Sequence, residues 1–116
     1  MKVFIGHLMY NKTSDEILSE RELMEKVIKE AYKDEEIEIL ESYFTDYTPE
    51  TTPLEFLGKV ISVLSKADIA VFMHNAYECK GCRVEMKCCR EYGITTRYLV
   101  NTGDGYIITA DISEFK

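Results

Sequence analysis

The sequence predicts an α/β protein with a mainly parallel five-stranded sheet and helices on both faces. Short apolar segments alternate with segments whose apolar residues recur at three- and four-residue steps. This alternation is typical of parallel strands joined by crossover helices. The length of 116 residues suffices for one compact domain, which we expect to span residues 1–116, and hardly for two.

The first strand is predicted at residues 3–5, which are apolar and partly β-branched and are followed by Gly6. His7, Met9 and Tyr10 then fall in a loop. Ser19 and Glu22 fit a capping box, so a helix is expected to begin there and to run to about Lys33. Its apolar face would comprise Leu23, Val27, Ile28, Ala31 and Tyr32.

A second strand is expected from about residue 35, where Ile37, Ile39 and Glu41 alternate with their neighbours. Residues 45–52 are polar and include a proline, which predicts a loop. The second helix has a strong start: Thr52 as N-cap, Pro53 at the first helical position, and Glu55 three residues after the cap. Its apolar face would comprise Leu57, Val60, Ile61, Leu64 and Ala67.

The apolar residues 69–73 predict the third strand, and residues 74–80 form a polar loop. Gly81 lets the chain turn into a third helix that ends at Gly93. Residues 94–100 predict a fourth strand, residues 102–105 a turn, and residues 106–109 a fifth strand. The last seven residues carry no clear pattern.

The composition limits the kinds of partner that the protein is expected to bind. The formal net charge is −7, and no basic run could neutralise the phosphates of a nucleic-acid polymer, so we expect no such polymer. No apolar run approaches the length of a signal peptide core or a membrane span. We therefore expect a cytoplasmic protein without a membrane partner, whose four cysteines are reduced.

In parallel sheets, ligands bind beyond the carboxyl ends of the strands. The predicted elements place residues 7–10, 43–47 and 74–85 at that edge. Tyr10, Tyr43 and Tyr47 could stack on a base, although tyrosines near strand ends often only pack. His7 and His74 could contact a ligand, although a single histidine in a loop is often merely solvated. Asp68 lies at the opposite edge, where capping is the simpler expectation.

Glu85 is the carboxylate at this edge that draws most attention. We expect it in the first turn of the third helix, where an acid gains about 0.3–1 kcal/mol from the helix dipole. That interaction alone would explain it. The sharper hypothesis is a carboxylate that points into a pocket and acts as a nucleophile or a base.

The cysteines admit several interpretations. If residues 82–92 are helical, Cys82 and Cys89 lie about 10 Å apart along the axis, too far to bind one zinc ion. A three-ligand site of His74, Cys79 and Cys82 stays open. A redox pair of Cys79 and Cys82 at the helix N-terminus also stays open. The sequence offers no candidate for a cis-proline opposite this pair, because both prolines lie at or before the start of the second helix. For Cys88 and Cys89 we expect core packing.

Several segments together resemble the nucleoside 2-deoxyribosyltransferase-like family. A short strand ends in Gly6, an aliphatic helix runs into Ala67-Asp68 and an apolar strand, and a Gly-x-x-x-Glu-x-x-x-small pattern spans Gly81, Glu85 and Cys89. Gly93 then closes the helix. The resemblance covers most of residues 1–100 in order and spacing.

The resemblance implies a flavodoxin-like fold and chemistry at the N-glycosidic bond of a nucleoside or nucleotide, as a deoxyribosyltransferase or a deoxynucleotide N-hydrolase. It implies that Glu85 is the nucleophile, that no cofactor or metal is needed, and that the protein forms a homodimer. We expect the remaining site residues to bind substrate: Gly6, His7, Tyr10, Tyr43, His74, Cys79, Gly81 and Cys82.

Three positions depart from the family pattern. Val60 stands where the family has a catalytic Asp, Phe4 where it has a Tyr, and Cys79 where it has a Ser or Asp. Two alternatives follow. His7, Tyr10 or His74 replaces the missing proton carrier, or the protein is a nucleotide-binding module that has lost catalysis. A thiol redox protein that uses Cys79 and Cys82 is a further alternative.

Overall fold

Five strands form one sheet in the order β2-β1-β3-β4-β5. The structure, a computed structural model, describes residues 1–110. Neighbouring strands from β2 to β4 pair in parallel, and β5 pairs antiparallel with β4. The predicted mainly parallel sheet is confirmed, and its order is that of flavodoxin-like sheets with the last strand reversed. The strands are β1 (Lys2–Gly6), β2 (Glu38–Ile39), β3 (Ile69–Met73), β4 (Thr95–Asn101) and β5 (Tyr106–Thr109).

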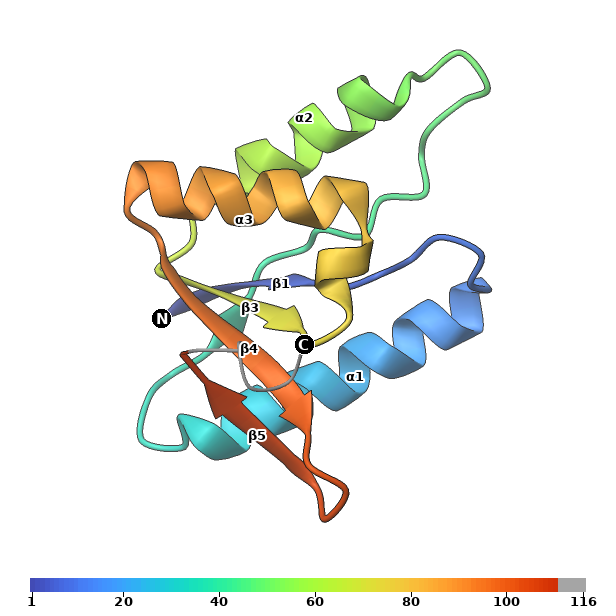
Figure 1. Cartoon of the computed structure of the whole chain (residues 1–116). Helices are drawn as coiled ribbons and strands as arrows, with labels where there is room; N and C mark the ends of the chain where they lie inside the picture. Colours follow the sequence, from blue (N-terminus) through green and yellow to red (C-terminus); the bar gives the residue numbers. More distant parts are fainter. Residues whose placement is uncertain (111–116) are drawn as a thin grey trace.

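Helices cover both faces of the sheet, as predicted (Figure 1). Helix α1 (Ser14–Ala31) lies on one face, and α2 (Pro53–Leu64) and α3 (Lys80–Tyr92) lie on the other. Alternate residues of the inner strands therefore point into two separate cores. The α1 core contains Val3, Ile5, Met24, Ile28, Ile69, Val71, Met73 and Leu99. The α2/α3 core contains Phe4, Val60, Leu64, Ala70, Phe72, Ala76, Cys82 and Cys89.

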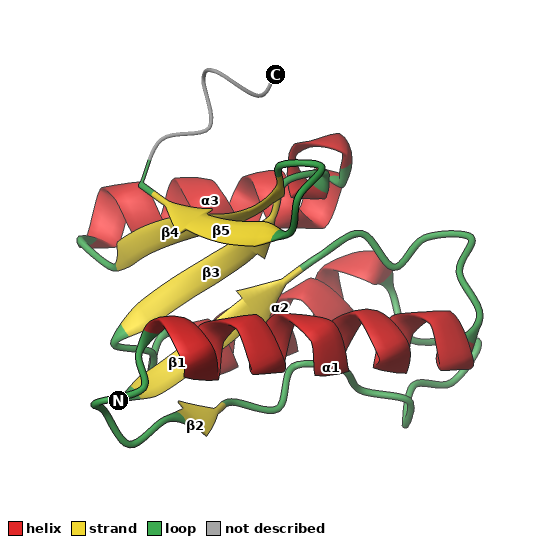
Figure 2. Cartoon of the chain, turned by 90° about the horizontal axis from the view of Figure 1, so that it is seen from below, coloured by secondary structure: helices red, strands yellow, loops and turns green. Residues whose placement is uncertain are grey.

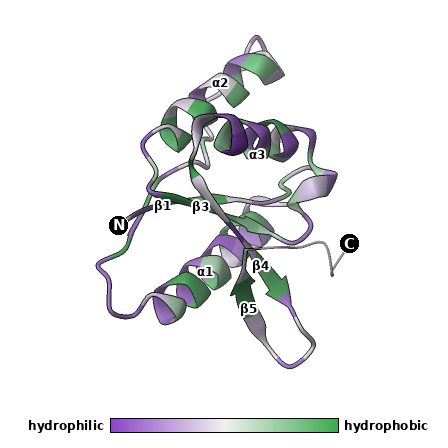
Figure 3. Cartoon of the chain, turned by 60° about the vertical axis from the view of Figure 1, so that its left-hand side comes forward, coloured by the Kyte–Doolittle hydropathy of each residue, from purple (hydrophilic) through white to green (hydrophobic). Residues whose placement is uncertain are grey.

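The hydropathy of the helices follows these two cores. In Figure 3, α1 and α2 each carry both hydrophobic and hydrophilic surface, as helices do when one face packs on a sheet. In the described residues no helix is long and apolar enough to cross a bilayer.

The register brings the carboxyl ends of the parallel strands to one edge. Gly6 at the end of β1 pairs with Phe72 in β3, and Phe72 pairs with Tyr98 in β4. All three helices begin on this side of the sheet, and a short 3₁₀ turn, η1 (Ala76–Glu78), leads from β3 into α3 (Figures 1 and 2). At the opposite edge, Asp68 accepts a hydrogen bond from the Lys2 backbone N–H at 2.7 Å, which confirms its expected capping role.

The predicted start of the first helix is wrong. Helix α1 begins at Ser14, and its capping box uses Thr13 as N-cap with Glu16 three residues later. Ser19 is an exposed residue inside the helix. The longer helix adds Ile17, Arg21 and Met24 to a buried face that includes the predicted Ile28, with Val27 and Tyr32 packed beside it. The predicted core residue Ala31 is exposed.

The other elements lie close to their predicted bounds. Thr52 and Glu55 form the expected capping box of α2. Strands β3 and β5 occupy the predicted residues, and Gly93 ends α3 in the left-handed conformation. Strand β2 is shorter than predicted, with two residues. Of the seven C-terminal residues without a prediction, 111–116 lie outside the described residues.

Candidate functional site

Glu85 lies in the second turn of α3, because the helix begins at Lys80. The expected position in the first turn is therefore wrong, and the helix dipole explains the residue less well, since that effect fades beyond the first turn. Although Glu85 carries a carboxyl group, the residue is only 7% exposed. Helical spacing places Cys82, Glu85 and Cys89 on the same buried face of α3.

Two glycines make room for this carboxyl group. A Cβ atom on Gly6 would lie 3.4 Å from Glu85 Oε1, and one on Gly81 would lie 3.8 Å from Glu85 Oε2. The carboxyl group thus occupies the space between the end of β1 and the start of α3. The same Gly6 Cβ would lie 2.5 Å from Phe72 Cδ1, so the end of β1 accepts only glycine without movement of its neighbours.

No side chain or backbone group of residues 1–110 donates a hydrogen bond to Glu85. Within that part of the chain, Asn75 Oδ1 is the one fully buried side-chain oxygen or nitrogen without a partner. The Glu85 oxygens must therefore keep a small contact with solvent. A buried carboxyl group that reaches solvent and lacks a protein donor is open to a ligand.

Cys79 is the N-cap of α3, with extended backbone, and its thiol is half-buried. Cys82, three residues later, is buried, and its thiol donates a hydrogen bond to the backbone carbonyl of His7, 3.6 Å from Cys82 Sγ. The sulfur of Cys79 lies beside it and can accept the same proton instead. The structure thus joins Gly6, Cys79, Gly81 and Cys82 to Glu85 in one cluster.

The cluster shifts the protonation of its members in opposite directions. Burial, with the nearby Cys79 sulfur as a second cause, raises the pKa of Glu85 to about 8. The hydrogen bond from the Cys82 thiol, with help from the N–H groups of Cys82 and Gly81, lowers the pKa of Cys79 to about 5 despite partial burial. At neutral pH the resting pair therefore consists of a Cys79 thiolate and a protonated Glu85.

His7 lies in the loop after β1, as predicted, but its ring is not solvated. The side chain is buried, and both ring nitrogens have partners. Its Nδ1 is 2.7 Å from Glu20 Oε1, and its Nε2 is 3.3 Å from Arg21 Nη1. A guanidinium group can only donate, so Nε2 is the acceptor and Nδ1–H donates to Glu20. Both nitrogens of the ring are thus engaged within the protein.

Further polar groups extend this network. Arg21 donates to Ser42 Oγ at 3.1 Å, and Ser42 donates to the carbonyl of Ile5 at 3.3 Å. Lys12 donates to Glu20 Oε2 at 2.9 Å. Burial disfavours the Glu20 carboxylate, but the hydrogen bonds from His7 and Lys12 outweigh that cost and lower its pKa. The sequence interpretation missed the network, although Arg21 follows Ile17 and precedes Met24 and Ile28 at helical steps and so stands among core positions.

The other predicted contacts at the edge are not brought to Glu85. Tyr10 is 79% exposed and Tyr47 is 63% exposed. The Tyr43 hydroxyl lies 3.1 Å from Ser14 Oγ, so it links the loop after β2 to the start of α1. His74 is exposed, and its backbone N–H pairs with the carbonyl of Leu99.

Phe4 and Val60, which replace polar residues of the family pattern, both belong to the α2/α3 core. The Phe4 ring packs against Phe72 with centroids 6.1 Å apart. The two departures are therefore compatible with each other, because both extend the same apolar contact. Cys89 is a buried member of this core and Cys88 packs against it, which confirms the expected packing role.

In the described residues no three His, Cys, Asp or Glu side chains gather closely enough to hold a metal ion. The hypothetical His74, Cys79 and Cys82 site is therefore wrong as a metal centre. The four cysteines are free thiols.

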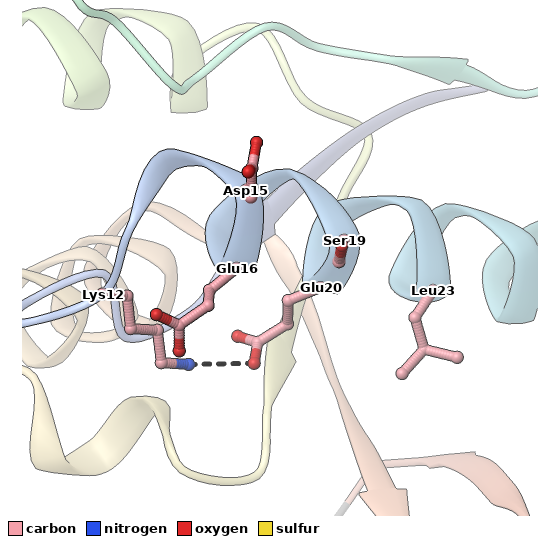
Figure 4. Close-up of a pocket in the computed structure, with 6 residues that line it drawn as sticks. All are labelled: Lys12, Asp15, Glu16, Ser19, Glu20 and Leu23. Carbon is pink, nitrogen blue, oxygen red and sulfur yellow. Dashed lines mark hydrogen bonds and ion pairs between the residues drawn. The ribbon is translucent and has the colours of Figure 1, made fainter.

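Glu85 lines neither of two hollows on the described surface. One hollow is formed by α1 and the loop before it, where the side chains of Lys12 and Glu20 meet (Figure 4). The other follows the open edge of β2 beside α1 and includes Ile39, Arg21 and Leu18.

No protein-family model matches the chain, and no curated protein matches it in sequence.

Proposed function

We propose that this protein binds a nucleoside or nucleotide and cleaves or transfers its N-glycosidic bond, with Glu85 as the nucleophile. The observation that carries the proposal is the Glu85 carboxyl group at the carboxyl edge of the sheet, buried, without a protein donor and still in contact with solvent. The resemblance of the flanking sequence to nucleoside 2-deoxyribosyltransferases supports the same assignment.

The reaction begins when an ionised Glu85 oxygen attacks C1′ of the deoxyribosyl group. A C–O bond forms, the C1′–N bond breaks, and its electron pair goes to the base nitrogen, which takes a proton. Water or a second base then attacks C1′ and releases Glu85 as a carboxylate, so the configuration at C1′ is retained.

Cys79 gives this mechanism a proton carrier in place of the Asp that Val60 replaces. The Glu85 proton moves to the Cys79 thiolate, which leaves a carboxylate nucleophile and a thiol acid in one cluster. At neutral pH the pair rests with the proton on Glu85, so this transfer is uphill and has to be driven by substrate binding.

The base would lie at the carboxyl end of β1, beside Glu85. Tyr10 is exposed on the loop after β1 and would stack on the base once that loop folds over the site, whereas the Tyr47 ring already packs edge-on against Phe56. The proposal includes a homodimer, in which the neighbouring chain would close this open side of the site, and a cytoplasmic location, where nucleotides are abundant.

The test is release of free base from the deoxynucleosides and their 5′-monophosphates at pH 8, measured chromatographically under reducing conditions. We expect release by the wild type and loss of at least a hundredfold in rate with Glu85→Gln. Glu91→Gln is the matched control, because Glu91 is an exposed carboxylate on the same helix. Equal release by Glu85→Gln would refute the role of Glu85.

A second candidate is a nucleotide-binding module without turnover, which the apolar Phe4 and Val60 favour. A rise in melting temperature with a nucleotide, without base release at any pH from 6 to 9, would establish this candidate instead of the enzyme. If the whole panel of nucleosides and nucleotides gave no base release and no thermal shift, both candidates would be contradicted.

A further inference from the structure

We infer that Cys79 and Cys82 form a thiol–disulfide exchange site, whose substrates are small disulfides of the oxidised-glutathione class. This inference does not rest on the proposed nucleoside chemistry, since it requires no nucleoside. It follows from three features of the cluster: an outer and an inner thiol, their position at a helix start, and a buried carboxyl group beside them.

The two thiols differ in access. Cys79 is half-buried and meets solvent, whereas Cys82 is 3% exposed. An incoming disulfide can therefore reach Cys79 first, and Cys82 is placed to act only after a mixed disulfide has formed on Cys79. This division into an attacking and a resolving thiol is what a two-step exchange requires.

The position at the helix start allows the two sulfurs to join. Side chains three residues apart on a helix have Cβ atoms about 5–6 Å apart, whereas a disulfide needs about 3.5–4.5 Å. Cys79 is the N-cap and has φ −95° and ψ 123°, so its backbone is not held by the helical pattern. A small rotation at this residue can close the gap without unwinding α3.

The surroundings of Cys79 favour its reactive form. Its sulfur accepts from the Cys82 thiol and faces the N–H groups of Gly81 and Cys82, and Arg83 adds a positive charge. These groups hold the pKa of Cys79 near 5, so the thiolate predominates at neutral pH. Cys82, by contrast, has a raised pKa, chiefly because it donates to Cys79, and it needs a base before it can attack.

Glu85 can supply that base. It follows Cys82 by three residues on the same buried face of α3, and its negative charge is one cause of the raised pKa of the Cys82 thiol. After Cys79 has reacted, its negative charge is gone, and Glu85 ionises more readily because one cause of its raised pKa has been removed. The carboxylate then takes the Cys82 proton.

The disulfide exchange takes place in two steps. The Cys79 thiolate attacks one sulfur of the substrate disulfide, forms a mixed disulfide and expels the first thiolate. Cys82 loses its proton to Glu85 and attacks the Cys79 sulfur, which forms the Cys79–Cys82 disulfide and expels the second thiolate. The substrate gains two electrons and the cysteine pair loses two.

The experiment exposes the reduced protein to glutathione buffers of graded redox potential, quenches with acid and locates the modified cysteines by peptide mass spectrometry. We expect reversible loss of two hydrogens in the peptide that contains Cys79 and Cys82. Cys82→Ser should accumulate a mixed glutathione disulfide on Cys79, and Cys79→Ser should form neither product. Cys88→Ser is the control and should behave as the wild type, because Cys88 packs on the α2/α3 core outside the cluster.

Two rates test the roles of Cys79 and Glu85 separately: alkylation of Cys79 and disulfide closure by Cys82. At pH 6 we expect iodoacetamide to modify Cys79 roughly tenfold faster than any other cysteine, because its pKa of about 5 keeps Cys79 mostly as the thiolate there. Glu85→Gln should leave mixed-disulfide formation on Cys79 intact but slow closure by Cys82. No reversible disulfide in the wild type, or equal modification of Cys88, would overturn the inference whatever the result of the base-release assay.

Discussion

The Glu85 carboxyl group lies against the backbone of Gly6, so closely that a Cβ atom at residue 6 would be 3.4 Å from Oε1. The last residue of β1 and the second turn of α3 are 79 positions apart in the sequence, and the fold brings them into contact. The absence of a side chain at Gly6 is therefore part of the site and not only of the strand.

Gly6→Ala should destabilise the protein by about 1–3 kcal/mol, because its Cβ would also lie 2.5 Å from the Phe72 ring and would force that ring to move. Gly58→Ala is the matched control. Nothing lies within 4 Å of a Cβ at Gly58, which is exposed inside α2, so alanine there should stabilise by about 0.5–1 kcal/mol. Urea unfolding measures both changes, and equal effects would show that Gly6 is not confined.

His7→Ala should destabilise the protein by about 1–3 kcal/mol, because it removes a buried ring together with its hydrogen bonds to Glu20 and Arg21. His74→Ala should stay within about 0.5 kcal/mol, because His74 is exposed and only its backbone is engaged. Thermal unfolding of the two variants compares them directly. If His74→Ala proved the more damaging, the buried network would not have the assigned role.

Cys79 and Glu85 should change the free energy of unfolding in opposite directions as pH rises. Glu85 has a pKa of about 8 in the folded protein against an ordinary 4.5, so the folded state keeps a proton that the unfolded chain has lost. Its contribution to the free energy of unfolding therefore falls as pH rises from about 4.5 to about 8. Cys79 has a folded pKa of about 5 against an ordinary 9.0, so its contribution rises between about pH 5 and pH 9.

Single variants separate these two slopes, which oppose each other in the wild type. Glu85→Gln should become more stable with rising pH over this interval, and Cys79→Ser should become less stable. At pH 8 the free energy of unfolding of Glu85→Gln should be higher than that of the wild type by up to about 4 kcal/mol, since each pKa unit corresponds to about 1.4 kcal/mol. Denaturant unfolding from pH 5 to 9 supplies the curves, and parallel curves for the two variants would contradict the assignment.

Most of the fold could be predicted because its elements are locally encoded. The capping box at Thr52 and the left-handed Gly93 mark helix ends that depend on a few adjacent residues, and both were predicted from the sequence. The first helix shows how this reasoning fails. Two capping patterns occur there, at Thr13 and at Ser19, and the helix that begins after Thr13 also buries Ile17, which precedes Ser19.

The site was only partly predictable, for a related reason. The spacing of Gly81, Glu85 and Cys89 placed these residues together, because residues on one helix have a fixed separation. The contact between Glu85 and Gly6, and the burial of His7 between Glu20 and Arg21, depend on how distant segments pack. A charged residue at a core position of a helix, as Arg21 is, was the available signal for that network.

If Glu85 forms a covalent bond to the sugar, mass spectrometry of the protein quenched during turnover should detect that bond. With a deoxynucleoside whose base is released, we expect a deoxyribosyl adduct on the peptide that contains Glu85. The adduct should disappear in Glu85→Gln and persist in Glu91→Gln. Base release that proceeds without any adduct on Glu85, or an adduct that survives in Glu85→Gln, would contradict the account.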